Sequence, residues 1–440
     1  MNKFAKHVWP LSAAVVENQL QIDTVPVNDL AERYGTPLYI FDEATIRDAC
    51  QQYKSAFATY PGWVEFSYAS KALLNTAVAK LLLEEGFGFD VVSLGEMQLA
   101  MHAGAKPEQL HLHGNAKPRF ELEEALKAGI GRIAVDNLDE ARTLAELCAE
   151  LDTPASIILR IEPAVAASTH KAIQTGQKGS KFGMSLELVD SFVEIVDESP
   201  HLELVGLHFH LGSQLFDLSD YQKALGVVLD LMVDLWDDHQ IEITEISPGG
   251  GLAAAYSATD QIPNPAELAD TIVDFIVTGC NQRRLSIPTL ILEPGRSIIS
   301  RAGVAVYEVI GSKPIEDAPA GSAQKYLHVD GGMGDNLRPA LYGAKYTAVS
   351  ASEVEANQTE MVHISGRFCE SGDILLKNAE VAPSAVGDVI AFASAGAYTL
   401  SIANNYNLVP RPLVLMMDGG QERIIQRRET FEDLIRRDVE

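Results

Sequence analysis

Short apolar runs alternate with amphipathic stretches through the first two-thirds of the chain. Eight runs have the length and composition of buried β-strands, and each ends in, or is followed directly by, a polar, charged or glycine residue; they cover residues 62–69, 87–92, 110–114, 132–135, 156–161, 204–210, 242–247 and 289–293. Between them, apolar residues recur at i, i+3 and i+4 in segments that often close with glycine, which is typical of helices. Eight strands that alternate with helices predict a closed parallel (β/α)8 barrel whose strand ends build one active site.

The pattern changes near residue 301. Strand-like runs with glycine or aspartate turns replace most of the helices, as in VAVYEVIGS, KYLHVDGG and GDVIAFASAGAY. The first 35 residues, which include QLQIDTVPV, have the same texture. We therefore expect an α/β protein of two parts: a barrel over residues 36–300, and a mostly β domain, a β-sandwich or β-barrel, built from residues 1–35 and 301–440.

Composition limits the class of partner. Apolar residues make up 47% of the 440 residues, which is ample for large cores, and a net charge of −27 argues against nucleic acid or an anionic membrane as the main partner. The sequence contains no run of about 18 apolar residues, so we expect no transmembrane helix. The four cysteines lack CxxC spacing, and the amino terminus lacks a small-residue cleavage site, so we expect a cytoplasmic protein.

Three strand ends carry residues suited to chemistry. Lys71 follows the first strand, where desolvation makes a lysine amine a usable nucleophile, although taken alone a solvent-facing lysine at a helix start is the commoner interpretation. Glu293 ends the eighth strand and needs a cationic partner, which could be a protonated pyridine nitrogen or Arg296. The glycines of SPGGGL (247–252) end the seventh strand and let backbone N–H groups close on an anion such as phosphate.

Histidines recur on one face of two strands. Period-two spacing places His208 with His210 and His111 with His113, and two such pairs could indicate a metal site. No carboxylate is spaced in the sequence to complete such a site, and the nearby glycines favour phosphate. We therefore interpret His210 as a ring that stacks on a flat cofactor, and the other three histidines as barrel filling, with no metal bound.

Polar groups beside glycines mark the second domain. A lone cysteine is usually a small hydrophobe, but the acidic neighbours Glu370 and Asp373 favour a neutral thiol at Cys369 that can donate a proton. The other candidates there are Arg338 and Tyr342 in LRPALYG and Tyr398 in AGAYTLS, while Asp90, Arg160 and Ser213 lie at or just beyond barrel strand ends.

An amine, a carboxylate for a pyridinium, a phosphate cradle and a stacking imidazole are together what pyridoxal phosphate requires. The chain resembles the barrel-type (alanine racemase-fold) pyridoxal-phosphate decarboxylases. The matching stretches run in order nearly end to end: YGTPLYIFDE, FSYASK, FDVVSLGE, HGNAKP, LRIEP with SKFGMS, GLHFHLGSQ, PGGGL, EPGRSI, LRPALYG, CESGD, GAYTLSIANNYN and VPRP. The last four are similar to the diaminopimelate branch of that family.

The resemblance implies a role for each candidate. Lys71 bonds covalently to pyridoxal 5'-phosphate, Glu293 pairs with its pyridine nitrogen, His210 stacks on its ring, and Cys369 reprotonates the substrate carbon. The resemblance further implies that the cofactor is bound by Asp90, Arg160, Ser213, Gly250, Gly251, Gly295, Arg296 and Tyr398. It implies that the far end of the substrate is bound by Arg296, Arg338, Tyr342, Glu370 and Tyr398.

The implied reaction is decarboxylation of meso-2,6-diaminopimelate to L-lysine and carbon dioxide, the last step of lysine biosynthesis. The resemblance also implies a homodimer in which the β domain completes the active site, because the CESGD segment reaches the partner's site. Two departures from the family pattern lie beside the cofactor: Leu73-Leu74 after the lysine motif and Ser247-Pro248 before the glycines. They question local geometry rather than the class of reaction.

Other interpretations stay open. A decarboxylase of ornithine, arginine or carboxynorspermidine has the same barrel, but Arg338 would repel a purely cationic substrate end. An amino-acid racemase has it too, although FCESGD does not resemble the racemase signature. A non-catalytic pyridoxal-phosphate-binding protein would lack a β domain such as residues 301–440, and a metal-dependent hydrolase would use the histidine pairs.

Overall fold

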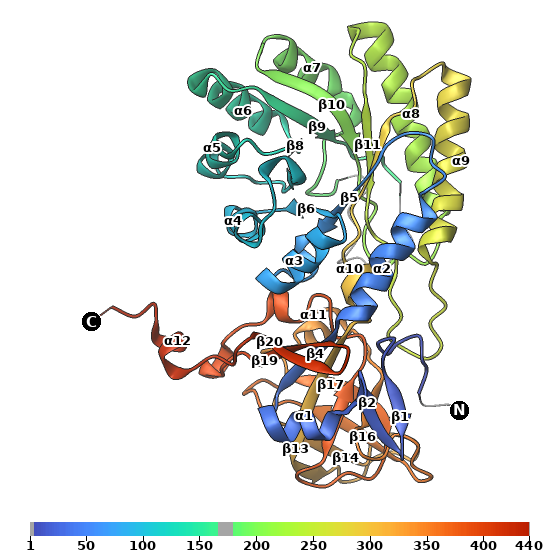
Figure 1. Ribbon diagram of the computed structural model, residues 1–440, viewed down its shortest axis with the longest axis vertical. Helices are drawn as coiled ribbons and strands as arrows, with labels where there is room; N and C mark the ends of the chain where they lie inside the picture. Colours follow the sequence, from blue (N-terminus) through green and yellow to red (C-terminus); the bar gives the residue numbers. More distant parts are fainter. Residues whose placement is uncertain (1–3, 166–178, 440) are drawn as a thin grey trace. The chain divides into compact units, whose positions relative to one another are not determined.

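The computed structural model describes residues 4–165 and 179–439, and the chain divides into two compact units (Figure 1). The barrel unit comprises residues 50–253 and 262–296, and the β unit comprises residues 1–49, 254–261 and 297–440. Residues 36–49, which the sequence pattern assigned to the barrel, group with the β unit. The reason is strand pairing: β4 (Leu38–Asp42) pairs with β13 (Gly303–Pro314) and β19 (Leu413–Asp418).

Eight parallel strands close the barrel, so the predicted (β/α)8 fold is confirmed. Around the barrel they are β5 (Val64–Ala69), β6 (Gly88–Val91), β7 (Leu110–Leu112), β8 (Arg132–Val135), β9 (Ala155–Arg160), β10 (Leu202–His208), β11 (Glu245–Gly249) and β12 (Thr289–Leu292). Each matches one of the eight apolar runs of the sequence. The largest shift is at β11, which begins three residues later than the pattern indicated and continues to Gly249.

Helices follow the barrel strands in turn. They are α3 (Thr76–Glu84), α4 (Leu94–Ala103), α5 (Arg119–Ala128), α6 (Leu138–Leu151), α7 (Val189–Asp197), α8 (Ser219–His239), α9 (Pro265–Arg283) and the short α10 (Arg296–Ile299). Side chains of Ser93, Asn137 and Asn264 accept hydrogen bonds from first-turn N–H groups, which satisfies donors that have no partner within the helix. No helix in residues 4–165 and 179–439 is long and apolar enough to cross a membrane.

The first barrel helix begins later than the apolar periodicity indicated. Asn75 is the N-cap of α3, and its side chain accepts a hydrogen bond from the Val78 N–H at 3.0 Å. Lys71 instead lies in a separate 3-10 turn, Ser70–Ala72, that directly follows β5, and Leu73 after it is extended. The expectation of a helix that starts at Lys71 is therefore wrong, and the lysine stands at the strand end itself.

The barrel interior is polar near the amino-terminal ends of its strands. Arg132 pairs with Glu245 through two guanidinium nitrogens, and His111 Nε2 lies 3.0 Å from Glu65 Oε1. These four side chains come from β8, β11, β7 and β5, so they tie together strands that are not neighbours in the barrel. His111 fills the barrel as predicted, and it does so as a partner of a carboxylate.

The β unit contains two sheets. The short strands β1 (Ala14–Val16), β2 (Gln19–Ile22) and β3 (Val25–Pro26) form one sheet, followed by α1 (Val27–Tyr34). The nine-stranded sheet has the order β17-β16-β14-β13-β4-β19-β20, with β15 and β18 off this path. Its further strands are β14 (Lys325–Val329), β15 (Ala348–Ser350), β16 (Glu360–Ser365), β17 (Ile374–Val381), β18 (Val389–Phe392) and β20 (Gln421–Gln426). The predicted mostly β second part is thus confirmed.

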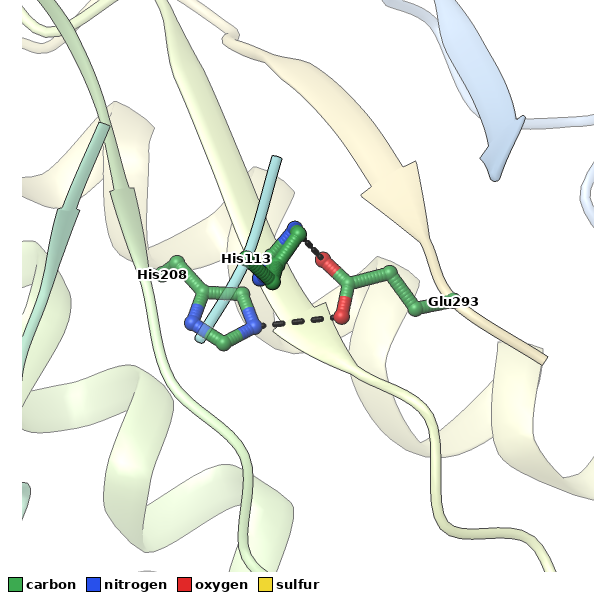
Figure 2. Close-up of side chains that lie close together, drawn as sticks. All are labelled: His113, His208 and Glu293. Carbon is green, nitrogen blue, oxygen red and sulfur yellow. Dashed lines mark hydrogen bonds and ion pairs between the residues drawn. The ribbon is translucent and has the colours of Figure 1, made fainter. Parts of the chain in front are cut away.

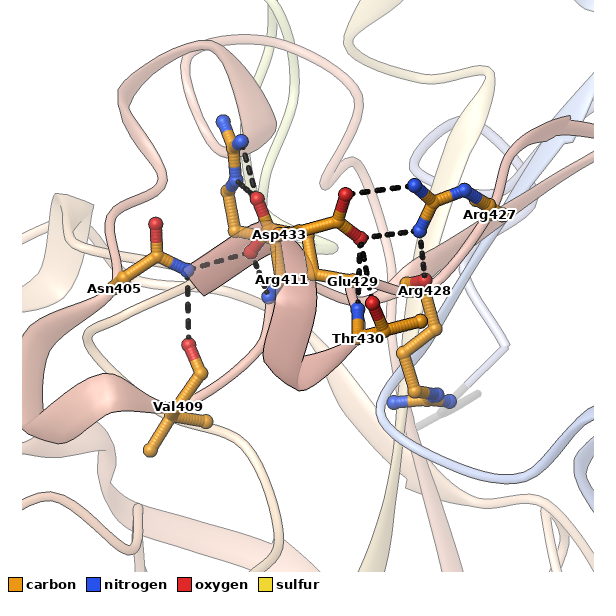
Figure 3. A network of polar contacts seen from close by, with 8 residues as sticks. All are labelled: Asn405, Val409, Arg411, Arg427, Arg428, Glu429, Thr430 and Asp433. Carbon is orange, nitrogen blue, oxygen red and sulfur yellow. Dashed lines mark hydrogen bonds and ion pairs between the residues drawn. The ribbon is translucent and has the colours of Figure 1, made fainter. Parts of the chain in front are cut away.

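A network of charged side chains holds the end of the chain (Figure 3). Glu429 accepts hydrogen bonds from Arg411 Nε at 2.7 Å and from Asn405 Nδ2 at 2.5 Å, and Arg427 Nη2 donates to Asp433 at 2.7 Å. Asp433 belongs to α12 (Phe431–Ile435). Arg427 thus holds the last helix, and Glu429 attaches the segment before that helix to the VPRP stretch.

Candidate active site

The barrel candidates gather at the carboxyl ends of the strands. His208 ends β10, Arg160 ends β9, Asp90 lies in β6, Lys71 follows β5 and Glu293 follows β12. In parallel barrels this end of the strands carries the catalytic groups, while the opposite end serves stability. The sequence pattern therefore placed Lys71, Asp90, Arg160 and Glu293 at this end of the barrel, whereas it assigned His208 to barrel filling.

Glu293 is the centre of a buried polar cluster. Its Oε2 accepts a hydrogen bond from His208 Nε2 at 3.1 Å, and its Oε1 accepts one from Ser247 Oγ at 2.6 Å. His113 Nε2 lies 3.6 Å from Oε1, beyond hydrogen-bond distance. Figure 2 shows both imidazole rings beside the carboxylate, and the exposed fractions of the three residues are 4% for His113, 1% for His208 and 5% for Glu293.

The cluster holds Glu293 as an anion. Burial alone raises the pKa of the Glu293 carboxyl, but the histidines and the hydrogen bonds from His208 and Ser247 hold that pKa well below its usual range. Burial lowers the pKa of His208 and, more strongly, that of His113, so both imidazoles are neutral. The barrel thus carries a negative charge at the end of β12 that is stabilised by neutral donors.

The same three residues meet the spacing of a metal site. His113, His208 and Glu293 each offer one ligand atom, and these three atoms all lie within 4.8 Å of one another. The inference that no carboxylate joins the histidines is therefore wrong, because barrel closure brings Glu293 to them from a distant part of the sequence. His208 Nε2 forms a hydrogen bond with Glu293 Oε2, so a metal bound through this nitrogen would have to replace that hydrogen bond.

Lys71 and Asp90 form a second pair in the barrel. Lys71 Nζ lies 3.9 Å from Asp90 Oδ2, and the lysine side chain is 45% exposed while that of Asp90 is 3% exposed. Burial raises the pKa of the Asp90 carboxyl to about 7, although Lys71 acts to lower it. The arrangement places an accessible amine beside a carboxyl group that changes its protonation near neutral pH.

Glycines and a serine line the ends of β10 to β12. Gly250 and Gly251 have no room for a side chain, since an added Cβ would collide with the carbonyl oxygens of Glu293 and Gly212 respectively. Arg296 donates to Ser213 Oγ from both Nε and Nη2 at 3.0 Å. A buried guanidinium, a hydroxyl and closely packed glycine backbone are suited to bind an anion.

Three predicted residues near strand ends, Arg160, His210 and Gly295, have defined surroundings. Arg160 Nη1 is 3.6 Å from Asp136 Oδ1, and its guanidinium lies 4.5 Å from the centre of the Phe182 ring. His210 is partly exposed, yet burial lowers the pKa of its imidazole well below the usual range, so the ring is neutral. Gly295 packs against Ala69 and Ala72, where a Cβ would meet Ala69 at 2.9 Å.

The predicted substrate residues lie in the β unit. Arg338 begins α11 (Arg338–Tyr342); its Nη1 donates to Tyr346 Oη at 2.7 Å, and its guanidinium lies 4.5 Å from the centre of the Tyr256 ring. Tyr342 ends the same helix and is partly exposed. Tyr398 has a φ of 57°, a conformation that non-glycine residues rarely adopt and that often marks functional sites.

Cys369 and Glu370 are exposed in the loop before β17. The Cys369 N–H donates to Asn407 Oδ1 at 2.9 Å, and the Cys369 carbonyl accepts a hydrogen bond from Tyr406 Oη at 3.4 Å. Backbone contacts therefore fix the loop and leave the thiol at the surface. Cys369 is the exposed cysteine, whereas Cys50, Cys148 and Cys280 are buried, and all four are free.

Sequence reasoning missed three members of the Glu293 cluster. His113 and His208 were interpreted as barrel filling, and Ser247 only as a departure from a glycine motif. Period-two spacing had shown that His208 faces the barrel interior, but the sequence held no signal for the residue that it meets. Lys117 was also missed: its Nζ donates to Gly114 O, Ala134 O and Glu140 Oε1, each at 2.6 Å, and so ties the HGNAKP loop to β8 and α6.

Comparison with known proteins gives consistent matches over the chain. Residues 43–300 match the family model described as pyridoxal-dependent decarboxylase, pyridoxal binding domain. A diaminopimelate decarboxylase from Bacillus subtilis (strain 168) is 38% identical over 422 residues, which cover 96% of this chain and 95% of that protein.

Solved structures of diaminopimelate decarboxylases are also similar to this chain. The crystal structure of diaminopimelate decarboxylase from M. jannaschii has a TM-score of 0.90 and 34% identity, covering 97% of this chain and 98% of the other. Diaminopimelate decarboxylase from Helicobacter pylori complexed with L-lysine has a TM-score of 0.85 and 33% identity, covering 93% and 98%. The fold and the sequence therefore agree with the same group of enzymes.

Proposed function

The chain belongs to the diaminopimelate decarboxylases, a group of pyridoxal-dependent decarboxylases, and from that membership we propose that it converts meso-2,6-diaminopimelate to L-lysine and carbon dioxide. The enzyme is then a carbon–carbon lyase that depends on pyridoxal 5'-phosphate. The observation that carries the proposal is the anionic Glu293, buried at the carboxyl end of the barrel that also presents the Lys71 amine.

The barrel residues fit pyridoxal phosphate. Oδ1 of the buried Asp90 has no hydrogen-bond partner among residues 4–165 and 179–439, and the glycine backbone at Gly250 and Gly251 leaves no room for a Cβ. These features suit a polar ligand with a phosphate group. Lys71 would hold the cofactor covalently, Glu293 would hold its ring nitrogen, His210 would cover its ring, and Asp90 and Arg160 would lie beside it.

The phosphate group would bind at the ends of β10 to β12. Ser213, Gly250, Gly251, Gly295 and Arg296 supply a hydroxyl, backbone N–H groups and a guanidinium there, and we assign Tyr398 to the same group on the resemblance in sequence. Bound pyridoxal phosphate supplies an electron sink for the bonding electrons of the departing carboxylate.

The β unit would recognise the substrate and return a proton. Arg338, with Arg296, would bind the distal carboxylate, because a guanidinium can bind a carboxylate through two hydrogen bonds. Glu370 would bind the distal ammonium group, and Tyr342 and Tyr398 would help to orient the chain of the substrate. The Cys369 thiol would donate a proton to the carbon atom that has lost carbon dioxide. The exposure of this thiol supports that role.

The substrate assignment is tested by an assay with four compounds. Holoenzyme is incubated separately with diaminopimelate, ornithine, arginine and lysine, and released carbon dioxide is measured. We expect the highest kcat/KM with diaminopimelate, because Arg338 favours a distal carboxylate and repels a purely cationic end. A higher value with ornithine or arginine would assign the chain to the alternative decarboxylases, and no release from any compound would favour a non-catalytic binding protein.

We also propose a homodimer with shared active sites. The exposed Cys369 and Glu370 support it, because residues that act only on a partner's substrate are exposed within their own chain. Lys71→Ala and Cys369→Ala are each expected to be inactive or slow. When the two variants are unfolded, mixed and refolded together, random pairing makes half of the dimers heterodimers, each with one complete site. The mixture should therefore recover up to about a quarter of wild-type activity. No recovery, when the two variants carry different affinity tags and sequential purification on both tags isolates the heterodimer, would overturn shared sites.

We place the protein in the cytoplasm. All four cysteines are free, and free cysteines are typical of reducing compartments. Fractionation of cells that express the protein at its natural level tests this location, and recovery with periplasmic or extracellular markers would contradict it.

A further inference from the structure

The carboxylate of Glu293 has two buried hydrogen-bond donors that the proposed function leaves without a role. They are the His208 imidazole on β10 and the Ser247 hydroxyl on β11, and both residues are 1% exposed. Figure 2 shows His208 approaching the carboxylate from one strand while the carboxylate extends from the end of β12. Each donor occupies a different oxygen of Glu293, so the plane of the carboxylate is fixed.

The hydrogen bonds have a defined direction. Ser247 Oγ accepts a hydrogen bond from the Gly249 N–H at 3.1 Å, which leaves its own hydrogen for Glu293 Oε1. His208 Nδ1 has no hydrogen-bond partner among residues 4–165 and 179–439. A neutral ring that carries its hydrogen on Nε2 therefore donates to Glu293 and leaves no buried N–H group without an acceptor. Both groups therefore donate, and Glu293 accepts twice.

His113 offers a matched comparison within the same cluster. Its ring centre lies 4.9 Å from that of His208, and it is similarly buried, but its Nε2 is 3.6 Å from Glu293 and makes no hydrogen bond there. The other ionisable groups that act on Glu293 include Glu65 on β5, Asp90 on β6, Arg160 on β9, His210 after β10 and Tyr221 on α8. The hydrogen bonds of 3.1 Å from His208 and 2.6 Å from Ser247 distinguish these two residues.

We propose that His208 and Ser247 are positioning residues for the cofactor: by donating to Glu293 they keep its carboxylate ionised and oriented, so that the ring nitrogen of pyridoxal phosphate stays protonated. The inference rests on the proposed role of Glu293 and adds the residues through which that role is maintained. Without one donor, burial favours the neutral acid, and a neutral Glu293 no longer stabilises a positive charge on the ring. The departure Ser247 in the glycine motif then has a physical purpose, since it supplies a donor beside a carboxylate.

The test uses holoenzyme that carries pyridoxal phosphate labelled with ¹⁵N at the ring nitrogen. The NMR resonance of that nitrogen reports its protonation, and titration of apoenzyme followed by visible absorbance gives the cofactor dissociation constant. We expect His208→Met and Ser247→Ala to move the resonance towards the unprotonated position and to weaken cofactor binding about 10- to 100-fold, the loss typical of a hydrogen bond to a charged group.

Two variants separate positioning from packing. His208→Gln keeps an N–H near the Nε2 position, so we expect a protonated ring nitrogen and binding within about threefold of wild type, and His113→Met removes an equally buried imidazole that makes no hydrogen bond to Glu293. Unchanged resonance and affinity in both His208→Met and Ser247→Ala would overturn the proposal, as would equal losses in His208→Met, His208→Gln and His113→Met. Ser247→Ala removes a single oxygen and keeps the test valid where a histidine variant fails to fold. Because the resonance does not depend on turnover, a wrong substrate assignment leaves this result interpretable.

Discussion

The ε-amino nitrogen of Lys71 lies 3.9 Å from Oδ2 of Asp90 at the carboxyl end of the barrel. The pair joins an accessible side chain to a buried one, because Lys71 stands in a turn after β5 whereas Asp90 faces the interior from β6. Burial raises the pKa of Asp90 to about 7. The charge beside the lysine therefore changes within the pH range in which the enzyme is handled.

Asp90 should make the stability of the apoenzyme depend on pH. Its pKa is raised on folding, so its contribution to stability is complete below the unfolded pKa near 3.9 and is lost as pH rises through about 7. Between pH 6 and pH 8, the free energy of unfolding of wild type should fall by about 1 kcal/mol more than that of Asp90→Asn. Urea unfolding at both pH values measures this difference.

Asp139→Asn is the matched control, because the Asp139 side chain is 95% exposed on α6. We expect it to follow the pH dependence of wild type. If Asp90→Asn also follows wild type, Asp90 does not titrate near neutrality in the folded protein.

Cys369→Ala should separate cofactor binding from turnover. Loss of a group that donates a proton lowers kcat by about 100-fold or more, while the barrel residues still hold the cofactor. The measurements are the visible absorbance of the bound cofactor, which we expect to be unchanged, and the rate of carbon dioxide release. Ser371→Ala, the loss of one polar atom in the same exposed loop, serves as the control. Normal turnover in Cys369→Ala would remove this thiol from the mechanism.

Arg338 should determine affinity for the distal carboxylate. Arg338→Met is expected to raise KM for diaminopimelate about 100-fold without changing cofactor absorbance, because it removes the partner of a substrate charge. Arg338→Lys keeps the charge but loses the hydrogen bond to Tyr346 and the contact with Tyr256, so an intermediate KM is expected. Arg411→Met removes an arginine paired with Glu429 and should leave KM unchanged. Equal KM values in all three variants would exclude Arg338 from substrate binding.

The histidine cluster should function without a metal ion. Both oxygens of Glu293 accept hydrogen bonds from protein side chains, so dialysis against a chelator should leave the rate of carbon dioxide release unchanged. Elemental analysis of purified holoenzyme should find far less than one zinc or other transition-metal ion per chain. Loss of activity that zinc restores in wild type, but that it does not restore in His113→Met, would instead establish the metal site that the spacing of these residues allows.

Much of the barrel could be predicted from the sequence, because each strand forms a separate apolar run with a polar or glycine residue at or just after its end. The start of α3 could not be predicted from apolar periodicity, which continues through Lys71. A local hydrogen bond from the Val78 N–H to the Asn75 side chain decides where that helix begins. The fully buried strand β4 was assigned to the barrel because its partners β13 and β19 lie far away in the sequence.

The residues of the candidate site were easier to predict than their contacts. Strand ends led to the prediction of Lys71, Glu293 and His210, and the glycine run led to the prediction of an anion site at Gly250 and Gly251. The contact between His208 and Glu293 depends on the register and closure of the barrel, since the two residues are 85 positions apart. Periodicity shows which face of a strand a side chain occupies, but it does not show which side chain lies opposite.

The covalent attachment of the cofactor tests the central claim most directly. Holoenzyme is reduced with borohydride, digested and mapped by mass spectrometry, with Lys80→Ala as a control because Lys80 is an exposed lysine of the neighbouring helix α3. We predict that the pyridoxyl label is found on Lys71 in wild type and Lys80→Ala, and that Lys71→Ala loses both the label and the visible absorbance. A label on another lysine, or none in protein saturated with pyridoxal phosphate, would contradict the account.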